Sequence, residues 1–235
     1  MENAKAHCVV IGVGAGTGLA CAQRFAADGY HVSMIARNAK RLQGFADETP
    51  NSSAHPADIT DIEQFRATLR KIAAEHGSPS VVLYNAALAT FQPYTELRVE
   101  DFERNFRANT TGLLVAAQEF APAMIEAGGG ALMVTGNTGS LRGVPSFVGF
   151  APTKASQRIL AESLARELGP KGVHVAYIVI DAMIDMPWAR KKIPDKPDDF
   201  FAKPADIADE VFHTAHQPPS TWSFLVQIRP SAESW

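Results

Sequence analysis

The sequence predicts an α/β protein built as one doubly wound domain, a parallel sheet with helices on both faces. Strand-like apolar runs alternate with helical segments along the whole chain, the order expected of parallel strands joined by helices. Several of these runs are apolar without interruption, as is typical of strands buried on both faces. The length of 235 residues and the 46% hydrophobic content suit a single domain, 1–235, with a substantial core.

Each element can be placed from its local pattern. The strands are expected at 7–11, 32–36, 53–57, 81–87, 131–136, 174–180 and 223–228. The helices are expected from the first glycine-rich turn to about Asp28, and then at 38–48, 61–76, 100–127, 150–168 and 204–216. In the third helix Ile62, Phe65, Leu69 and Ile72 share one face. The proline-containing stretch 182–203 is expected to be rich in loops.

Composition excludes several classes of function. The formal net charge of −3 argues against nucleic acid as a partner, and the basic run 190–192 is interpreted as a solvated loop. No apolar stretch is long enough to span a membrane, and residues 1–7 are too short and polar for a signal peptide, so a cytoplasmic protein is expected. Cys8 and Cys21 are expected to be buried apolar residues. The histidines show no paired spacing, which predicts no metal.

A glycine-rich turn follows the first strand and precedes the first helix, with Gly12, Gly14, Gly16 and Gly18. Glycine lets the backbone approach a phosphate closely, and a helix N-terminus offers free N–H groups and a positive dipole end. A flexible turn between strand and helix would also use glycines. The motif alone therefore leaves a dinucleotide site and a simple turn open.

The spacing of Gly12, Gly16 and Gly18 resembles that of the short-chain dehydrogenase/reductase family. Further family motifs follow in order, namely Asp58 after the third strand, Asn85-Ala86-Ala87 after the fourth, Asn109 in the long helix and Lys154 after the fifth strand. The resemblance implies a Rossmann-type fold with a seven-stranded parallel sheet. It also implies a nicotinamide dinucleotide cofactor and an oxidoreductase that acts on a carbonyl or alcohol.

The resemblance assigns a set of cofactor-binding positions to this chain. They are Gly12, Gly14, Gly16, Thr17, Gly18, Leu19, Arg37, Asp58, Ile59, Asn85, Ala86, Ala87, Lys154, Asp181 and Ile184. Ala36 stands where NAD-binding members of the family have an acid, and Arg37 follows it. An arginine can bind a 2′-phosphate in bidentate fashion, which favours NADP over NAD, although an arginine is also common on a helix surface.

The catalytic positions depart from the family pattern. The family uses a tyrosine and a lysine four residues apart, whereas this chain has Phe150 and Lys154. The family serine, thirteen positions before the tyrosine, corresponds to Asn137, whose amide can donate a hydrogen bond but not a hydroxyl proton. Whether Thr135, Thr138 or Ser140 replaces the serine stays open.

Asn109 lies on the helical stripe of Phe102, Phe106 and Leu113, which is expected to face the sheet. A polar side chain on an apolar stripe must find a partner. The resemblance implies a residue that holds a water in a proton relay next to Lys154, and this interpretation is favoured. The alternative is a core asparagine with local hydrogen bonds.

Three further residues have roles that stay open. Arg142 could bind an acidic substrate group or lie in a surface loop, and Asp181 and Asp185 could be acids of the pocket or caps of a strand end. Tyr84 is expected in the core.

The family places its substrate lid at 182–203. Here this stretch contains Met183, Met186, Trp188, Phe200 and Phe201, which suit an apolar pocket wall. The last strand is expected at a sheet edge, which would be protected in a homodimer or homotetramer.

Two hypotheses of function follow. The first is an NADP-dependent oxidoreductase for a small carbonyl or alcohol substrate, with an atypical proton-transfer site. The alternative is a catalytically silent NADP-binding or protein-interaction scaffold, because Phe150 cannot act as an acid or base.

Overall fold

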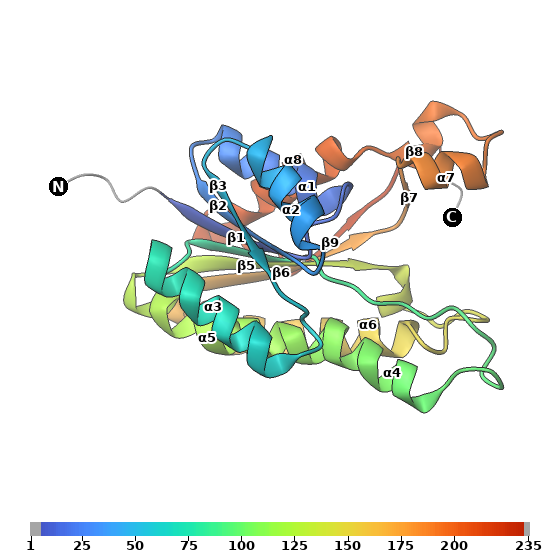
Figure 1. Cartoon of the computed structure of the whole chain (residues 1–235), viewed down its shortest axis with the longest axis horizontal. Coiled ribbons are helices and arrows are strands. Elements are labelled where there is room, and N and C mark those ends of the chain that lie inside the picture. The colour runs from blue at the N-terminus through green and yellow to red at the C-terminus, as the bar shows by residue number, and fades with distance from the viewer. Residues whose placement is uncertain (1–5, 233–235) are drawn as a thin grey trace.

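A seven-stranded parallel sheet forms the centre of the computed structural model, which describes residues 6–232 (Figure 1). Its strands are β1 (His7–Ile11), β2 (His31–Ala36), β3 (Ser52–Pro56), β4 (Val81–Tyr84), β5 (Gly130–Asn137), β6 (Val173–Ile180) and β9 (Leu225–Ile228). They lie in the order β3-β2-β1-β4-β5-β6-β9, and every neighbouring pair is parallel. The predicted fold class is confirmed. Part of the predicted polar N-terminus, 1–5, and the end of the tail, 233–235, lie outside the described residues.

Helices cover both faces of the sheet (Figure 1). One layer contains α1 (Thr17–Ala27), α2 (Ala39–Asp47) and α8 (Pro204–Ala215). The opposite layer contains α3 (Ile62–His76), α4 (Val99–Phe106), α5 (Gly112–Glu126) and α6 (Ala151–Leu168). Each layer has its own apolar cluster, one around Phe65 and Phe120 and the other around Phe25. Cys8 and Cys21 are free and fully buried in the second cluster, as predicted.

The long helix predicted at 100–127 is present as an unbroken helical run, but it is not α-helical throughout. A π-helix at Arg107–Thr111 separates α4 from α5. A π-turn adds a residue and shifts the phase of the helix, so the predicted stripe fails on its N-terminal side. Phe102 and Phe106 are only partly buried and pack edge to face at 5.1 Å between ring centroids. The core asparagine in this half is Asn105, which is 1% exposed.

Tyr84 places the π-helix against the sheet. Its hydroxyl donates to the carbonyl of Ala108, and the side chain is fully buried, as predicted. A Cβ on Gly112 would lie 2.2 Å from the Tyr84 oxygen, so only glycine lets α5 begin this close to β4. β4 itself ends at Tyr84, earlier than the predicted 87, and residues 85–87 are free to line a site.

The stretch 182–203 is more ordered than predicted. β7 (Met183–Ile184) pairs with β8 (Phe201–Ala202), and α7 (Pro187–Lys192) lies between them. The prolines of this stretch favour loops, but Pro187 lies in the first turn of α7, where a proline favours the start of a helix. The interpretation of 190–192 as a loop is wrong, because all three residues lie in α7. The two lysines are exposed, whereas Arg190 contacts Asp185 at 2.7 Å and Asp198 at 2.5 Å.

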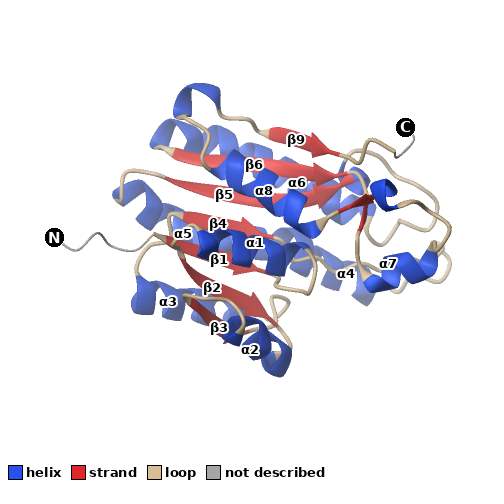
Figure 2. Ribbon diagram, turned by 90° about the horizontal axis from the view of Figure 1, so that it is seen from above, coloured by secondary structure: helices blue, strands red, loops and turns tan. Residues whose placement is uncertain are grey.

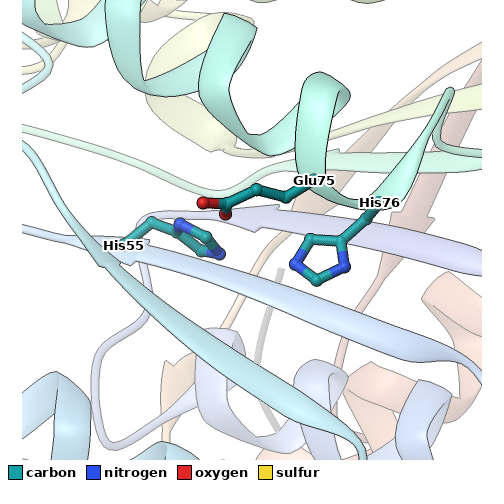
Figure 3. A group of neighbouring side chains, drawn as sticks. All are labelled: His55, Glu75 and His76. Atoms are coloured by element: carbon teal, nitrogen blue, oxygen red, sulfur yellow. The ribbon is translucent and has the colours of Figure 1, made fainter.

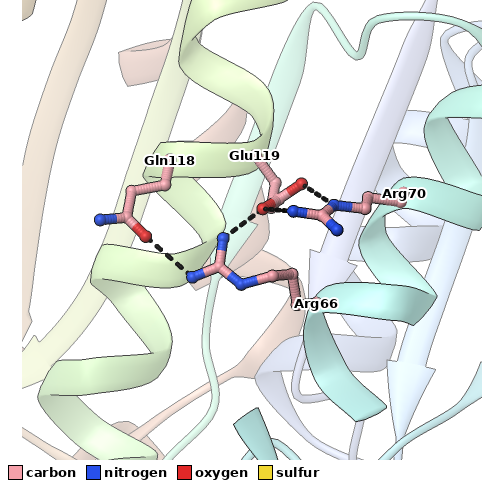
Figure 4. Close-up of polar contacts among 4 residues, drawn as sticks. All are labelled: Arg66, Arg70, Gln118 and Glu119. Atoms are coloured by element: carbon pink, nitrogen blue, oxygen red, sulfur yellow. Dashed lines mark hydrogen bonds and ion pairs between the residues drawn. The ribbon is translucent and has the colours of Figure 1, made fainter. Parts of the chain in front are cut away.

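An ion cluster joins α3 to α5 (Figure 4). Glu119 accepts from Arg66 and, at 2.9 Å, from Nε of Arg70, while Arg66 also donates to Gln118 at 3.0 Å. Partial burial alone would raise the pKa of Glu119, but the hydrogen bonds from Arg70 and Arg66 outweigh it and hold the pKa below its usual value.

The carboxyl ends of the strands point to one edge of the sheet, where α7 and the β7–β8 pair lie (Figure 2). In open parallel sheets, ligands bind outside this edge. β9 forms one border of the sheet, as the sequence predicts. No helix within residues 6–232 has the length and apolar character that a membrane crossing requires.

Candidate active site

A cavity of about 880 Å³ opens at the carboxyl edge of the sheet. It brings together predicted residues from seven separate parts of the chain. Those that line it are Gly12, Gly14, Gly16, Thr17, Gly18, Arg37, Asp58, Ile59, Asn85, Ala86, Ala87, Asn137, Phe150, Lys154 and Ile184. The volume lies in the range of sites for small molecules and cofactors.

Three predicted residues do not line this cavity. The side chain of Leu19 packs on the core, and its N–H donates to Gly14 O at 3.0 Å. The carboxylate of Asp181 accepts from Gln227 at 3.1 Å. Asn109 is fully buried beneath the cavity.

The positions of the first turn need glycine for different physical reasons. A Cβ on Gly12, where φ is +94°, would lie 2.4 Å from Ala86 Cα, and one on Gly18 would lie 2.6 Å from Gly12 O. Packing therefore requires glycine at both positions. At Gly14, in contrast, no heavy atom of residues 6–232 beyond its chain neighbours lies within 4 Å of an added Cβ. Gly14 instead keeps open a part of the cavity that a side chain would fill.

The N-terminus of α1 faces the same part of the cavity. Thr17 begins this helix and lines the cavity, and its hydroxyl is buried with no hydrogen-bond partner among the described residues. A buried hydroxyl without a partner calls for a ligand or a water. Free N–H groups, a positive helix end and an unused hydroxyl fit the oxygens of a pyrophosphate.

Two arginines lie at the far end of the cavity. Arg37 follows β2, and Arg41, which the sequence analysis missed, lies one helical turn later in α2. Asn38 begins α2 by accepting the Arg41 N–H at 2.9 Å, which places both cations beside the helix N-terminus. The spacing of four residues could have revealed Arg41. This pair fits a second, separate phosphate group.

Asp58 lies beside these arginines. Its Oδ1 accepts from the N–H of Thr60 at 2.9 Å and from the Thr60 hydroxyl at 2.8 Å. Partial burial favours a raised pKa, but the two Thr60 hydrogen bonds and the charges of Arg37 and Arg104 lower the pKa of Asp58 below its usual value. Asp58 is therefore an anion that partly balances the charges of Arg37 and Arg104.

Asn85 joins the ends of three strands. Its Nδ2 donates to Gly12 O at 2.8 Å, and its Oδ1 accepts from the Thr135 hydroxyl at 2.8 Å. The side-chain amide is thus used within the protein, and it fixes the glycine turn after β1 to the end of β5. Ala86 and Ala87 extend this floor into the loop.

Lys154 reaches the cavity from α6. The residue is 2% exposed, and its ammonium donates to Thr135 O at 3.0 Å and to Gln157 Oε1. Burial of this charge lowers the pKa of Lys154 from 10.5 to about 7. The group can therefore gain or lose a proton near neutral pH.

Gln157 accepts a hydrogen bond from the Lys154 ammonium, and the sequence analysis missed this residue. It is fully buried, and its Nε2 donates to the backbone carbonyl of Asn109 at 2.6 Å. A polar residue three positions after Lys154, on the buried side of α6, was the available signal. Gln157 links Asn109 to Lys154 with an amide side chain.

The side chain of Asn109 has local partners. Its amide bonds the N–H of Leu88 at 2.9 Å and the carbonyl of Leu88 at 2.8 Å, and it donates to Thr153 at 2.7 Å. These contacts support the alternative of a satisfied core asparagine for the side chain. The backbone carbonyl of Asn109, within the π-helix, is connected to Lys154 by hydrogen bonds through the side chain of Gln157.

Asn137 and Phe150 complete the cavity next to Lys154. Asn137 Oδ1 accepts from the Gly139 N–H at 3.0 Å, which fixes the amide and leaves Nδ2 as its donor. The hydroxyl of Ser140 donates to Asn137 O at 2.6 Å, and that of Thr135 donates to Asn85. Neither hydroxyl proton is therefore available to replace the family serine.

Other candidates lie away from the cavity. Asp185 pairs with Arg190 through two hydrogen bonds of 2.7 and 2.8 Å. Arg142 is exposed and borders a separate depression near the start of α6. None of the five apolar residues predicted as a pocket wall lines the cavity, which takes Ala182 and Ile184 from this stretch instead.

Comparisons with known proteins agree with this geometry. Residues 6–196 match the family model described as short chain dehydrogenase. An oxidoreductase, asL5, of Sarocladium schorii is 30% identical over 168 residues, which are 71% of this chain and 68% of the relative.

Two solved structures share the whole fold. A short-chain dehydrogenase from Rhodopseudomonas palustris is 31% identical, with a TM-score of 0.83 over 96% of this chain and 98% of the other. An alcohol dehydrogenase from the archaeon Thermococcus sibiricus, solved with 5-hydroxy-NADP, is 26% identical, with a TM-score of 0.85 over 97% and 98%. The family match spans most of the chain, and so the protein belongs to the short-chain dehydrogenase family.

Proposed function

We propose that the protein is an NADP-dependent oxidoreductase that interconverts a carbonyl and an alcohol. The observation that supports this most strongly is the lining of the cavity, which has open space at Gly14 with the unpartnered Thr17 hydroxyl in one part and the two cations Arg37 and Arg41 in another. A 2′-phosphate accounts for the two cations, and Ala36 supplies no acid that would bind a free ribose hydroxyl. The relative from Thermococcus sibiricus, solved with an NADP derivative, is in line with this choice.

When bound, the dinucleotide supplies or accepts the hydride. The chain itself must orient the substrate oxygen and move a proton. Asn137 Nδ2 is placed to donate a hydrogen bond to that oxygen. Such a fixed donor polarises a carbonyl and stabilises the negative charge that develops on the oxygen.

Lys154 is the candidate for the proton. Among the described residues that line the cavity, the ionisable ones are Arg37, Arg41, Asp58 and Lys154. The first three lie at the end formed by β2, α2 and the loop after β3. Lys154 alone lies beside Phe150 and Asn137, and its pKa of about 7 suits a general acid at neutral pH. Nζ therefore replaces the missing phenol, directly or through a water.

The substrate region is aromatic on one side. The ring centroid of Phe150 lies 5.4 Å from that of Phe91. Phe91 is 55% exposed, a high fraction for a phenylalanine. A carbonyl with an apolar substituent would cover this surface.

We also infer a homodimer or homotetramer, because β9 ends the sheet and Leu225 on it is 46% exposed.

The first experiment measures NADPH oxidation with a panel of ketones and aldehydes. We expect saturable NADPH binding and substrate-dependent turnover, with preference for carbonyls that have apolar substituents. Tight NADPH binding without turnover over the whole panel would instead favour the catalytically silent scaffold. Failure to bind NADPH or NADH would contradict both the oxidoreductase and the NADP-binding scaffold.

Arg41→Ala is expected to weaken NADPH binding by about tenfold or more and to leave NADH binding almost unchanged. Hydrogen bonds to a charged group contribute about 1.5–3 kcal/mol, and only NADPH has the 2′-phosphate that this arginine would bind. Calorimetric titration with both dinucleotides measures the difference. Arg98→Ala, an exposed arginine that does not line the cavity, is the matched control. Equal losses for both dinucleotides would contradict the assignment.

A further inference from the structure

Four of the seven histidines gather where the C-terminal end of α3 packs on the sheet. His7, His31 and His55 come from β1, β2 and β3, and His76 is the last residue of α3. The His76 ring centroid lies 4.0 Å from that of His31, 5.4 Å from that of His7 and 6.1 Å from that of His55. The lack of paired spacing predicted no metal, but the fold places these rings together from four elements.

Within this cluster, His55, Glu75 and His76 form a possible ligand set. One donor atom from each of the three lies within 4.8 Å of the other two. Figure 3 shows Glu75 and His76 descending from the end of α3 toward His55 on β3. None of the three lines the proposed dinucleotide cavity.

Ser53 orients the imidazole of His55. Its hydroxyl bonds His55 Nε2 at 2.9 Å and also bonds His31 Nε2 at 3.0 Å. A hydroxyl has one proton, so it donates to one ring and accepts from the other. In both cases Nδ1 of His55 takes no part in the bond to Ser53. A histidine that binds a metal through one nitrogen is usually fixed by a hydrogen bond at the other.

The carboxylate of Glu75 adds a negative charge to the two imidazoles, and this combination suits a cation. Lys71 lies 3.7 Å from Glu75 in an exposed pair, a contact that contributes little.

We propose that His55, Glu75 and His76 bind one divalent transition-metal ion, with zinc as the expected metal. Two imidazoles and one carboxylate are a common protein ligand set for zinc, and a water would complete four-coordination. Bonds of about 2.0–2.1 Å require ligand atoms about 3.3 Å apart. The ligands must therefore close around the ion, and the exposed side chain of Glu75 is free to move. The ion would join the end of α3 to β3.

The test is calorimetric titration of the tag-free, chelator-treated full chain with ZnCl₂. We expect saturable binding of one ion per chain and a rise in Tm with zinc. Glu75→Gln and His76→Asn are expected to weaken binding by about tenfold or more and to remove the Tm rise. Both positions lie at a helix end, where these changes spare the core.

Matched controls separate this site from general surface binding. Glu63→Gln changes an exposed acid in the first turn of the same helix, and His213→Asn changes an exposed histidine on α8. Both are expected to bind zinc as the native chain does. The proposal is overturned if the native chain shows no saturable binding, or if Glu75→Gln and His76→Asn both retain native affinity.

Discussion

Lys154→Met is expected to lower kcat/KM for carbonyl reduction by about 10²–10⁴, the usual contribution of a positioned general acid. The substitution removes the buried ammonium that donates to Thr135 O and Gln157 Oε1, and methionine fills the same space with an unbranched apolar chain. Lys171→Met, at an exposed lysine far from the cavity, is the control. Near-native activity of Lys154→Met would exclude Lys154 as the proton donor.

The pH dependence of kcat/KM tests the role of Lys154 as the proton donor independently. Because burial lowers the pKa of Lys154 to about 7, the native protein should reduce carbonyls fastest below that pH. Above it the donor loses its proton, and kcat/KM should fall about tenfold per pH unit. Alcohol oxidation should show the opposite trend, since it needs the neutral amine. The residual activity of Lys154→Met should lack this inflection.

Phe150→Tyr is expected to raise kcat/KM toward simple ketones by at least about tenfold. The ring of Phe150 is 5% exposed and borders the cavity next to Lys154 and Asn137, so a phenol there meets the substrate oxygen side of the site. The ammonium of Lys154 would lower the pKa of the new phenol and help it to exchange a proton. NADPH oxidation with a ketone series measures the gain.

Phe147→Tyr is the control for this substitution. Phe147 belongs to the same aromatic cluster but does not line the cavity, so a hydroxyl there should change activity little. Thermal unfolding of both variants checks that the cluster still packs. No gain for Phe150→Tyr in a folded protein would mean that the site has diverged beyond one hydroxyl.

The sheet and the glycine turn were predictable because their signals are local. Each buried strand is a short apolar run, and the turn has its glycines within seven residues. The π-helix around Asn109 could not be foreseen, since the apolar pattern does not show a shift of phase. α7 was missed because Pro187 looks like a breaker and is in fact a first-turn residue.

Contacts between distant elements were the hardest to predict. The histidine cluster depends on the register of three strands and on where α3 ends, which no spacing in the chain displays. Gln157 is similar, because its role appears only once the Asn109 carbonyl is placed above it by the π-helix. Sequence patterns thus located the site. The buried hydrogen bonds under the site could be found only from the three-dimensional structure.

The amide of Asn85 has a consequence for the energetics of binding. Because it fastens the turn after β1 to the end of β5, the floor of the cavity is already assembled before any ligand arrives. Fewer groups then have to be ordered on association, which lowers one of the costs of binding. Asn85→Ala should therefore weaken dinucleotide binding through the loss of this fixed floor.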